Sequence, residues 1–170
     1  MPAALAEINA CDRGRFVELL GPLFEHSPWV AEETFDRRPF RDPEHLHAEL
    51  CASMRAASET RQRGLIRAHP DLAGRLARQG QLTAASTAEQ KSAGLDRLRE
   101  DDLAELTHWN ERYREAHGFP FVICARLNDT AAILAAIRQR AVRTNEEEHQ
   151  AALAEIEKIA RLRLRDLLGE

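Results

Sequence analysis

The chain has 170 residues, of which 44% are hydrophobic and 31% are charged, and its formal net charge at pH 7 is −4. This balance is typical of a globular protein and argues against a disordered chain. The length favours a single domain over residues 1–170, with enough buried surface to fold alone. Basic residues alternate with acidic ones and form no stripe, which argues against a nucleic-acid partner. No apolar run approaches the roughly 20 residues that cross a bilayer.

The ends of the chain carry no sign of export or of an organelle address. The first residues lack the charged start and long apolar stretch of a signal peptide, and residues 168–170 do not match a peroxisomal signal. We therefore expect a cytoplasmic protein with no membrane partner.

Helix-start signals and apolar residues at three- and four-residue spacing predict helices along the first half of the chain. Asp12 predicts the start of a helix whose apolar residues are Phe16, Leu19, Leu20 and Leu23. Ser27-Pro28 and Asp42-Pro43 each place a proline directly after a capping residue. The helix behind the second signal carries on one face Leu46, Leu50 and Met54. Another helix is expected over Glu59–Ala68, because the residue before a proline resists helical geometry.

The second half continues the helical pattern. Gly80 and Gln81 predict a loop, and Ser86-Thr87-Ala88-Glu89 matches a capping box. The helix that this box opens is expected to continue through Leu95 and Leu98. The next helix is expected to end near Gly118, and its inward face carries Leu103, Leu106, Asn110 and Tyr113.

Phe119–Cys124 is the apolar run that most resembles a strand, although Pro120 argues against a central one. Asp129 or Thr130 then begins a helix whose inward residues are Ile133, Ile137 and Ala141. Thr144–Glu147 is a second capping box, which opens a long last helix ending near Leu168. These signals predict an all-α, single-domain bundle of about eight helices.

His69 is the first candidate functional residue, because it lies between a helix end and Pro70, where its backbone is restricted. Imidazole titrates near neutrality and therefore suits acid–base chemistry. The alternative is a histidine that only contacts the last carbonyls of the helix. From these two residues alone, the alternative is favoured.

Ser86–Gln90 form the second candidate site. The free amides of a helix start can hold a carbonyl or an anion, and Glu89 and Gln90 add an acceptor and a carboxamide. A capping box explains Ser86 and Glu89 without any ligand, but it does not explain Gln90. The third place, Gly118–Phe121, is either a packed connector or a segment that exposes its backbone to a pocket.

Arg163 in the last helix is the fourth candidate. Helical spacing puts it on one face with Ile156, Ala160 and Leu167, and it puts Arg161 and Arg165 on the polar side. A buried arginine needs a partner. An internal carboxylate and a substrate carboxylate both fit the guanidinium group, and the sequence leaves the two open.

The sequence offers no metal or cofactor motif. The cysteines Cys11, Cys51 and Cys124 contain no C-x-x-C pair, and we interpret them as structural thiols. His45 and His47 point to different faces of a helix, and no H-E-x-x-H motif occurs. A glycine-rich phosphate loop and a serine nucleophile elbow are also absent from the sequence.

Several short motifs follow one another in a specific order and at specific separations. They are Ser27–Ala31, Arg38–Phe40, Ala68–Ala73, Ser86 with Glu89-Gln90, Ala93–Leu95, Asn110 with Tyr113, Gly118–Phe121 and Leu162–Leu164. From about Phe16 to Leu167 the chain thereby resembles the 2-oxo-4-hydroxy-4-carboxy-5-ureidoimidazoline (OHCU) decarboxylase family. One departure is His117, because the family usually has an aromatic residue such as phenylalanine there.

The resemblance implies an all-α and usually dimeric enzyme of urate degradation that releases CO2 from its ureidoimidazoline substrate to give (S)-allantoin. It implies that His69 is the catalytic acid–base residue and that Glu89 and Arg163 assist it. It further implies a substrate pocket that is lined by Pro70, Ser86, Thr87, Ala88, Glu89, Gln90, Phe121, Val122, Ile123, Cys124 and Ala125.

The chemistry of this substrate explains why we expect no cofactor. The carbon that loses CO2 lies next to a C=N bond, which can take up the electron pair, so no metal, pyridoxal or thiamine is needed. One rival hypothesis is a non-catalytic helical module that binds a ureido ligand or a protein partner. Another is a lyase for a different ureido acid. The complete set His69, Glu89 and Arg163 favours the decarboxylase.

Overall fold

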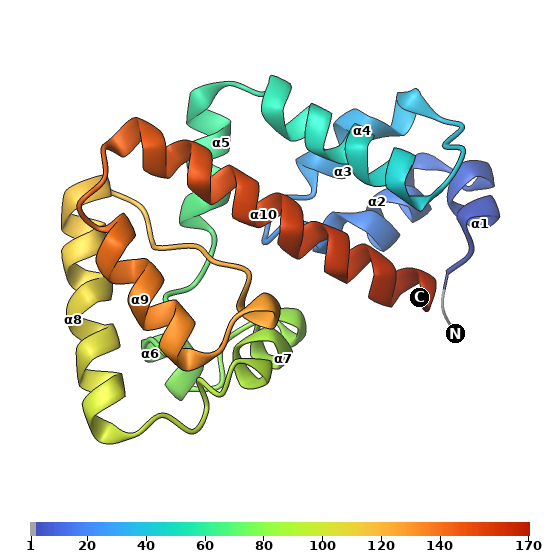
Figure 1. Ribbon diagram of the computed structural model, residues 1–170. Coiled ribbons are helices and arrows are strands. Elements are labelled where there is room, and N and C mark those ends of the chain that lie inside the picture. The colour runs from blue at the N-terminus through green and yellow to red at the C-terminus, as the bar shows by residue number, and fades with distance from the viewer. Residues whose placement is uncertain (1–2) are drawn as a thin grey trace. The chain divides into compact units, whose positions relative to one another are not determined.

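The computed structural model of the protein describes residues 3–170, which form ten α-helices and three 3-10 helices and contain no strand (Figure 1). The prediction of an all-α fold is therefore confirmed. Within this part of the chain, no helix is both long and apolar enough to cross a membrane.

The helices form two compact units, which are described one at a time. Unit 1 comprises the chain up to Ala68 together with Glu157–Glu170, and unit 2 comprises His69–Ile156. The last helix, α10 (Asn145–Leu168), contributes residues to both units. The expectation of one domain over residues 1–170 stays a prediction.

Unit 1 is built around α3 (Trp29–Thr34), against which α2 (Arg13–Leu20) and α4 (Pro43–Ala56) both pack. Its core includes Phe16, Leu20, Val30, Leu46 and Leu50, all without exposed surface. The N-terminal α-helices of this unit are α1 (Leu5–Ala10), α2 (Arg13–Leu20), α3 (Trp29–Thr34), α4 (Pro43–Ala56) and α5 (Glu59–Arg67). The 3-10 helices η1 (Gly21–Leu23) and η2 (Phe35–Arg37) lie between them in sequence.

The start signals of unit 1 are largely confirmed. Asp12 accepts a hydrogen bond from the Arg15 amide, and Asp42 accepts one from the His45 amide. α3 differs slightly, because it begins at Trp29 and its N-cap is Pro28. The Ser27 hydroxyl donates instead to the Glu25 carbonyl.

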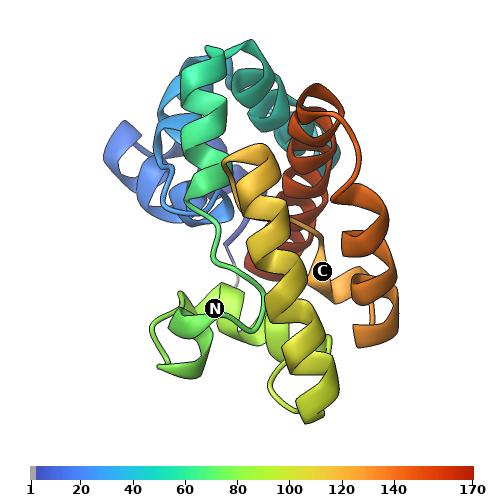
Figure 2. The ribbon, with the colours of Figure 1, turned by 90° about the vertical axis from the view of Figure 1, so that its left-hand side faces the viewer.

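Unit 2 contains α6 (Arg75–Arg78), α7 (Ala84–Ser92), α8 (Glu100–His117), η3 (Ala125–Leu127), α9 (Thr130–Arg140) and the first part of α10. α8 and α9 lie side by side in both ribbon views (Figures 1 and 2). α8 ends as predicted at Gly118, whose positive φ of 72° closes the helix. α1 and α6 were not predicted, because both are short and neither has a side-chain cap.

The predicted capping box at Ser86–Glu89 is wrong. The N-cap of α7 is Thr83, whose hydroxyl accepts a hydrogen bond from the Ser86 amide. Ser86 and Glu89 therefore lie inside the helix. A threonine three residues before a serine also offers a side-chain cap to the backbone, and here it prevails over the later signal.

The prediction that the same helix continues through Leu95 and Leu98 is also wrong. α7 ends at Ser92, and Gly94 has a positive φ of 79°. The Leu95 amide donates back to the Gln90 carbonyl at 3.0 Å, which closes the helix end.

The second capping box, at Thr144, is confirmed. The Thr144 amide donates to the Glu147 carboxylate at 2.8 Å, and the Glu147 amide donates to the Thr144 hydroxyl at 3.2 Å. The hydrogen bonds from Thr144 lower the pKa of Glu147 below its usual value. Because this pKa is lowered, the stabilisation is present at neutral pH and is lost as the pH falls through it.

The apolar run Phe119–Cys124 is irregular rather than a strand, and a buried network fixes it. The Arg140 guanidinium donates to the Val122 carbonyl at 2.8 Å and to the Glu148 carboxylate at 2.8 Å. The Tyr113 hydroxyl donates to the same carboxylate at 2.6 Å. Burial and the Glu148 carboxylate raise the pKa of Tyr113 far above its usual value, so its hydroxyl stays a donor.

His117 packs as one of a cluster of rings. Its ring centroid lies 4.5 Å from that of Tyr113 and 5.9 Å from that of Phe119. Its side chain is buried, and neither ring nitrogen has a hydrogen-bond partner among the described residues. The imidazole thus packs as one ring of this buried aromatic cluster.

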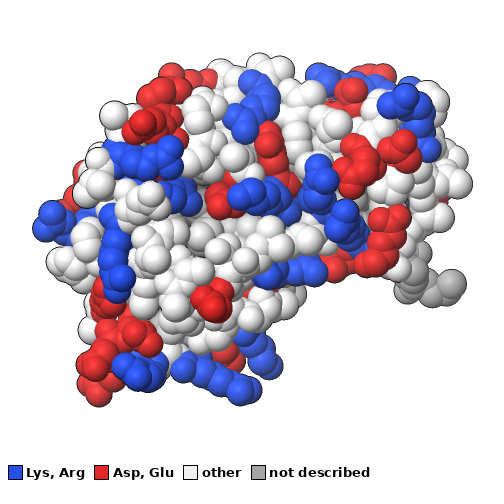
Figure 3. All heavy atoms as spheres, viewed as in Figure 1, with Lys and Arg blue, Asp and Glu red and all other residues white. Residues whose placement is uncertain are grey.

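The visible surface carries both signs of charge in alternation. On the face shown in Figure 3, basic and acidic side chains are interspersed with uncharged surface.

Cys51 and Cys124 are buried and Cys11 is partly buried, and all three are free thiols. Burial raises the pKa of the Cys51 thiol to about 12.

Tyr113→Phe is expected to lower the free energy of unfolding by about 1.5–3 kcal/mol, because it removes a buried hydrogen bond to a charged group. His117→Phe, one helical turn away in the same cluster, is the matched control. It removes no hydrogen bond and is expected to leave stability unchanged or raised. Urea unfolding of both variants measures the difference, and equal losses would contradict this account of the network.

Candidate active site

The loop that follows α5 carries His69 and doubles back tightly. His69 is buried and Pro70 is partly exposed. Ala73 has a positive φ of 50°, which is uncommon for a residue with a side chain. A Cβ on Gly74 would lie 2.8 Å from the Asp71 Cβ, so the turn leaves no room for a larger residue there.

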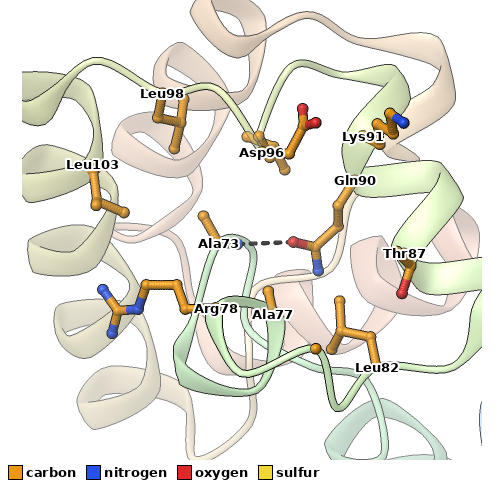
Figure 4. A pocket seen from close by; sticks show the side chains of 12 residues that line it. Ala73, Ala77, Arg78, Leu82, Thr87, Gln90, Lys91, Asp96, Leu98 and Leu103 are labelled. Carbon is orange, nitrogen blue, oxygen red and sulfur yellow. Dashed lines mark hydrogen bonds between the residues drawn. The ribbon is translucent and has the colours of Figure 1, made fainter.

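Side chains from α7 and α8 hold this loop by its backbone. Gln90 accepts a hydrogen bond from the Ala73 amide at 2.9 Å (Figure 4) and donates to the Asp71 carbonyl at 3.4 Å. Asn110 donates to the Leu72 carbonyl at 3.0 Å. The Gln90 side chain, which a capping box could not explain, thus has a structural partner.

Helix geometry divides the predicted set Ser86–Gln90. Each residue of an α-helix is turned by about 100° from the one before it, so five consecutive side chains cannot face one pocket. Ser86 and Gln90 are buried, Glu89 is partly buried, and Thr87 and Ala88 are exposed. Ser86, Glu89 and Gln90 follow three- and four-residue spacing and share one side of the helix.

The structure brings α7 together with the other predicted wall, Phe121–Ala125. All five residues of this wall are buried, and α7 packs against η3, which begins at Ala125. The pKa of the Cys124 thiol is raised, first by burial and then by nearby carboxylates, including those of Glu155 and Glu89. Glu89 therefore lies close enough to Cys124 to act on it electrostatically.

A cavity of about 440 Å³ is lined by Ala73, Gln90 and residues around their hydrogen bond (Figure 4). Thr87 and Gln90 line it, together with leucines and the charged residues Arg78, Lys91 and Asp96. The lining includes neither His69 nor Glu89. We therefore do not equate this cavity with the predicted substrate pocket.

Arg163 belongs to unit 1, where it forms a buried ion pair. Its guanidinium donates to the Glu25 carboxylate at 2.8 Å and to the Pro22 carbonyl at 3.2 Å. The side chains of Arg163 and Glu25 are 6% and 2% exposed, so the pair is shielded from solvent. The sequence left open whether Arg163 pairs with an internal carboxylate or with a substrate carboxylate. The structure contains the internal one, that of Glu25.

The predicted orientation of the last helix is confirmed, except that Leu167 is only partly buried. Ile156 and Ala160 are buried with Arg163, and Arg161 and Arg165 are exposed. The two exposed arginines both form ion pairs with Glu44.

Two buried polar residues, one that contacts Arg163 and one that contacts the loop after His69, were not among the candidate site residues. Glu25 follows the apolar pair Leu23-Phe24, and an acid within an apolar stretch is a signal for a buried partner. Asn110 lies between Leu106 and Tyr113 on the apolar face of α8, where a polar side chain also needs a partner.

Across residues 3–170, no group of three or more histidine, cysteine or acidic side chains is arranged to hold a metal ion.

Comparison with known proteins gives a consistent result. The model of the OHCU decarboxylase family matches residues 9–165. A 2-oxo-4-hydroxy-4-carboxy-5-ureidoimidazoline decarboxylase of Mus musculus is 42% identical over 165 residues, which cover 97% of this chain and 93% of that protein. A protein of the same name from Haloferax volcanii is 40% identical over 94% of this chain and 93% of its own length.

Solved structures agree with the sequence comparison. A crystal structure of (S)-allantoin synthase has a TM-score of 0.77 and 26% identity, and the match covers 98% of this chain and 54% of that one. A crystal structure of OHCU decarboxylase in the presence of (S)-allantoin has a TM-score of 0.70 and 20% identity, covering 94% of this chain and 100% of that one. At that identity, the second match shows a shared fold.

Glu25→Gln is expected to lower the free energy of unfolding by about 3–5 kcal/mol, because it leaves the Arg163 guanidinium buried without its carboxylate. Arg161→Ala on the same helix is the control, and its exposed ion pair is expected to contribute about 0–1 kcal/mol. Thermal and urea unfolding compare the two. A Glu25→Gln variant as stable as Arg161→Ala would show that the buried pair is not important for folding.

Proposed function

Because the chain belongs to the OHCU decarboxylase family, we propose that it converts 2-oxo-4-hydroxy-4-carboxy-5-ureidoimidazoline to (S)-allantoin and CO2 in the degradation of urate. The observation that carries the proposal is the family match over residues 9–165, which includes His69, Glu89 and Arg163. The protein is accordingly a lyase.

The substrate can supply the electron sink for this reaction. The bond between the ring carbon and the carboxylate breaks, and its electron pair moves toward the adjacent C=N bond, whose nitrogen gains a proton. The resulting enol loses its hydroxyl proton as a proton is added to the carbon that bears the ureido group. The products are CO2 and allantoin, and addition of this proton from one face gives one enantiomer. We accordingly propose that no metal or organic cofactor takes part.

We propose that His69 moves protons at the hydroxyl group and the ring during these steps. Its buried position after α5 and the hydrogen bonds that hold its loop support this role. Glu89 either orients His69 or binds the ureido group. Its partly buried position on α7, close to Cys124, is compatible with both.

We propose that Arg163 assists at the substrate carboxylate. The Glu25 carboxylate and the Pro22 carbonyl fix its guanidinium, which has five N–H donors. Pro70, Ser86–Gln90 and Phe121–Ala125 remain the proposed lining of the pocket. The side chains of Ser86, Glu89 and Gln90 share one side of α7, which supports a common role for these three.

From the resemblance we also propose a cytoplasmic homodimer. Sedimentation at the protein concentration of the activity assay measures the oligomeric state. A fully active monomer would show that assembly is not needed for the reaction.

The protein is expected to accelerate the decay of freshly generated substrate and to yield optically active allantoin. Circular dichroism follows the product after urate is oxidised and the hydroxyisourate is hydrolysed in the same cuvette. Exhaustive chelation is expected to leave the rate unchanged. Racemic product at the uncatalysed rate would favour the rival hypothesis of a module that only binds a ureido ligand or a protein partner.

Glu89→Gln is expected to reduce turnover while the protein unfolds at nearly the wild-type temperature. Glutamine and glutamate have similar helix propensity, and Glu89 lies within α7 rather than at its cap. Glutamine lacks the negative charge that a partner of His69 supplies. Glu111→Gln, which removes an exposed carboxylate from α8, is the control. Wild-type turnover in Glu89→Gln would remove Glu89 from the proposed mechanism.

A further inference from the structure

The loop His69–Gly74 has no regular secondary structure of its own, so other groups must satisfy its buried backbone. Side chains do this at successive positions after Pro70. Gln90 contacts the Asp71 carbonyl and the Ala73 amide, and Asn110 contacts the Leu72 carbonyl between them. Two carboxamides from two helices therefore fix the backbone that follows the proposed catalytic histidine.

A salt bridge holds the same loop from its exposed side. Arg114, one helical turn after Asn110 on α8, donates to the Asp71 carboxylate at 2.7 Å. The exposed pair contributes little by itself, because solvent screens it. The Asn110 bond is different, since both of its partners are buried.

Asn110 is an unusual choice for its position if stability alone is considered. It is 7% exposed and lies on the apolar face of α8 with Leu106 and Tyr113. Its Oδ1 atom is buried and has no hydrogen-bond partner in the described part of the chain. A buried acceptor without a partner is destabilising. The Nδ2 atom, in contrast, donates a hydrogen bond to the Leu72 carbonyl.

We propose that Asn110 is a positioning residue, which fixes the Leu72 carbonyl and thereby the place of the His69 imidazole. The effect of this positioning on catalysis rests on the proposed function. Asn110 does not need to touch the substrate. It acts through the loop, three residues after His69, where Pro70 restricts the backbone and Gly74 packs against Asp71.

The test uses Asn110→Asp, which keeps the shape of the side chain and replaces the N–H donor with an acceptor. Asn110→Ala also removes the donor without adding a charge, and it takes the place of the first variant if that variant does not fold. The imidazole nitrogen resonances of His69 are recorded in the wild type and the variant, and their absence in His69→Gln identifies them. Steady-state kinetics are measured well below the unfolding temperature.

The His69 resonances are expected to shift in the Asn110 variant, while those of His47 in unit 1 stay in place. We expect kcat to fall between about tenfold and a hundredfold, the range that a small misplacement of a catalytic group produces, with KM changed by no more than about twofold. Thr34→Val is the control for stability. It removes a buried hydroxyl that bonds to Ser53 in unit 1, and it is expected to lower the unfolding temperature without changing kcat.

Unshifted His69 resonances overturn the proposal whatever happens to kcat, and so does a wild-type kcat with shifted resonances. If the wild type does not act on the ureidoimidazoline, the proposed function fails. In that case the His69 resonances alone test whether Asn110 positions the imidazole, and a shift in the Asn110 variant supports this role.

Discussion

The organisation of unit 2 depends on a carboxylate with no exposed surface. Glu148, in the first turns of α10, accepts hydrogen bonds from Tyr113 on α8 and from Arg140 on α9. Arg140 also donates to the Val122 carbonyl, so the irregular segment Phe119–Cys124 is tied to the same charge. Removing a carboxylate from water is costly unless strong hydrogen bonds compensate. Three helices and one connector must therefore meet with defined geometry for this residue to be buried.

Much of the helical pattern is visible in the sequence, and the exceptions have physical causes. α4 and α10 were located correctly, because Asp42 and Thr144 cap them locally and no competing signal lies nearby. The start of α7 was misplaced, since Thr83 and Ser86 both offer a side-chain cap and the helix begins after the earlier one, Thr83. α1 and α6 have no side-chain cap, so a local pattern had nothing to detect.

For the candidate site, the sequence predicted the local features of its residues but not the contacts that they make with distant residues. The restricted His69-Pro70 step and the inward phase of Arg163 follow from adjacent residues and helical spacing. The partner of Arg163 does not, because Glu25 lies 138 positions away in the chain. The role of Gln90 has the same origin, since its bonds to Asp71 and Ala73 depend on how the loop folds onto α7.

The environment of the cysteines has a consequence for the redox chemistry of the protein. The reactive form of cysteine toward peroxides and alkylating reagents is the thiolate. Burial raises the pKa of both Cys51 and Cys124, and the carboxylates near Cys124 act in the same direction. Both sulfur atoms therefore stay protonated at neutral pH and are shielded from reagents. The proposed pocket wall at Cys124 thus contains a thiol that reacts slowly with peroxides and alkylating reagents at neutral pH.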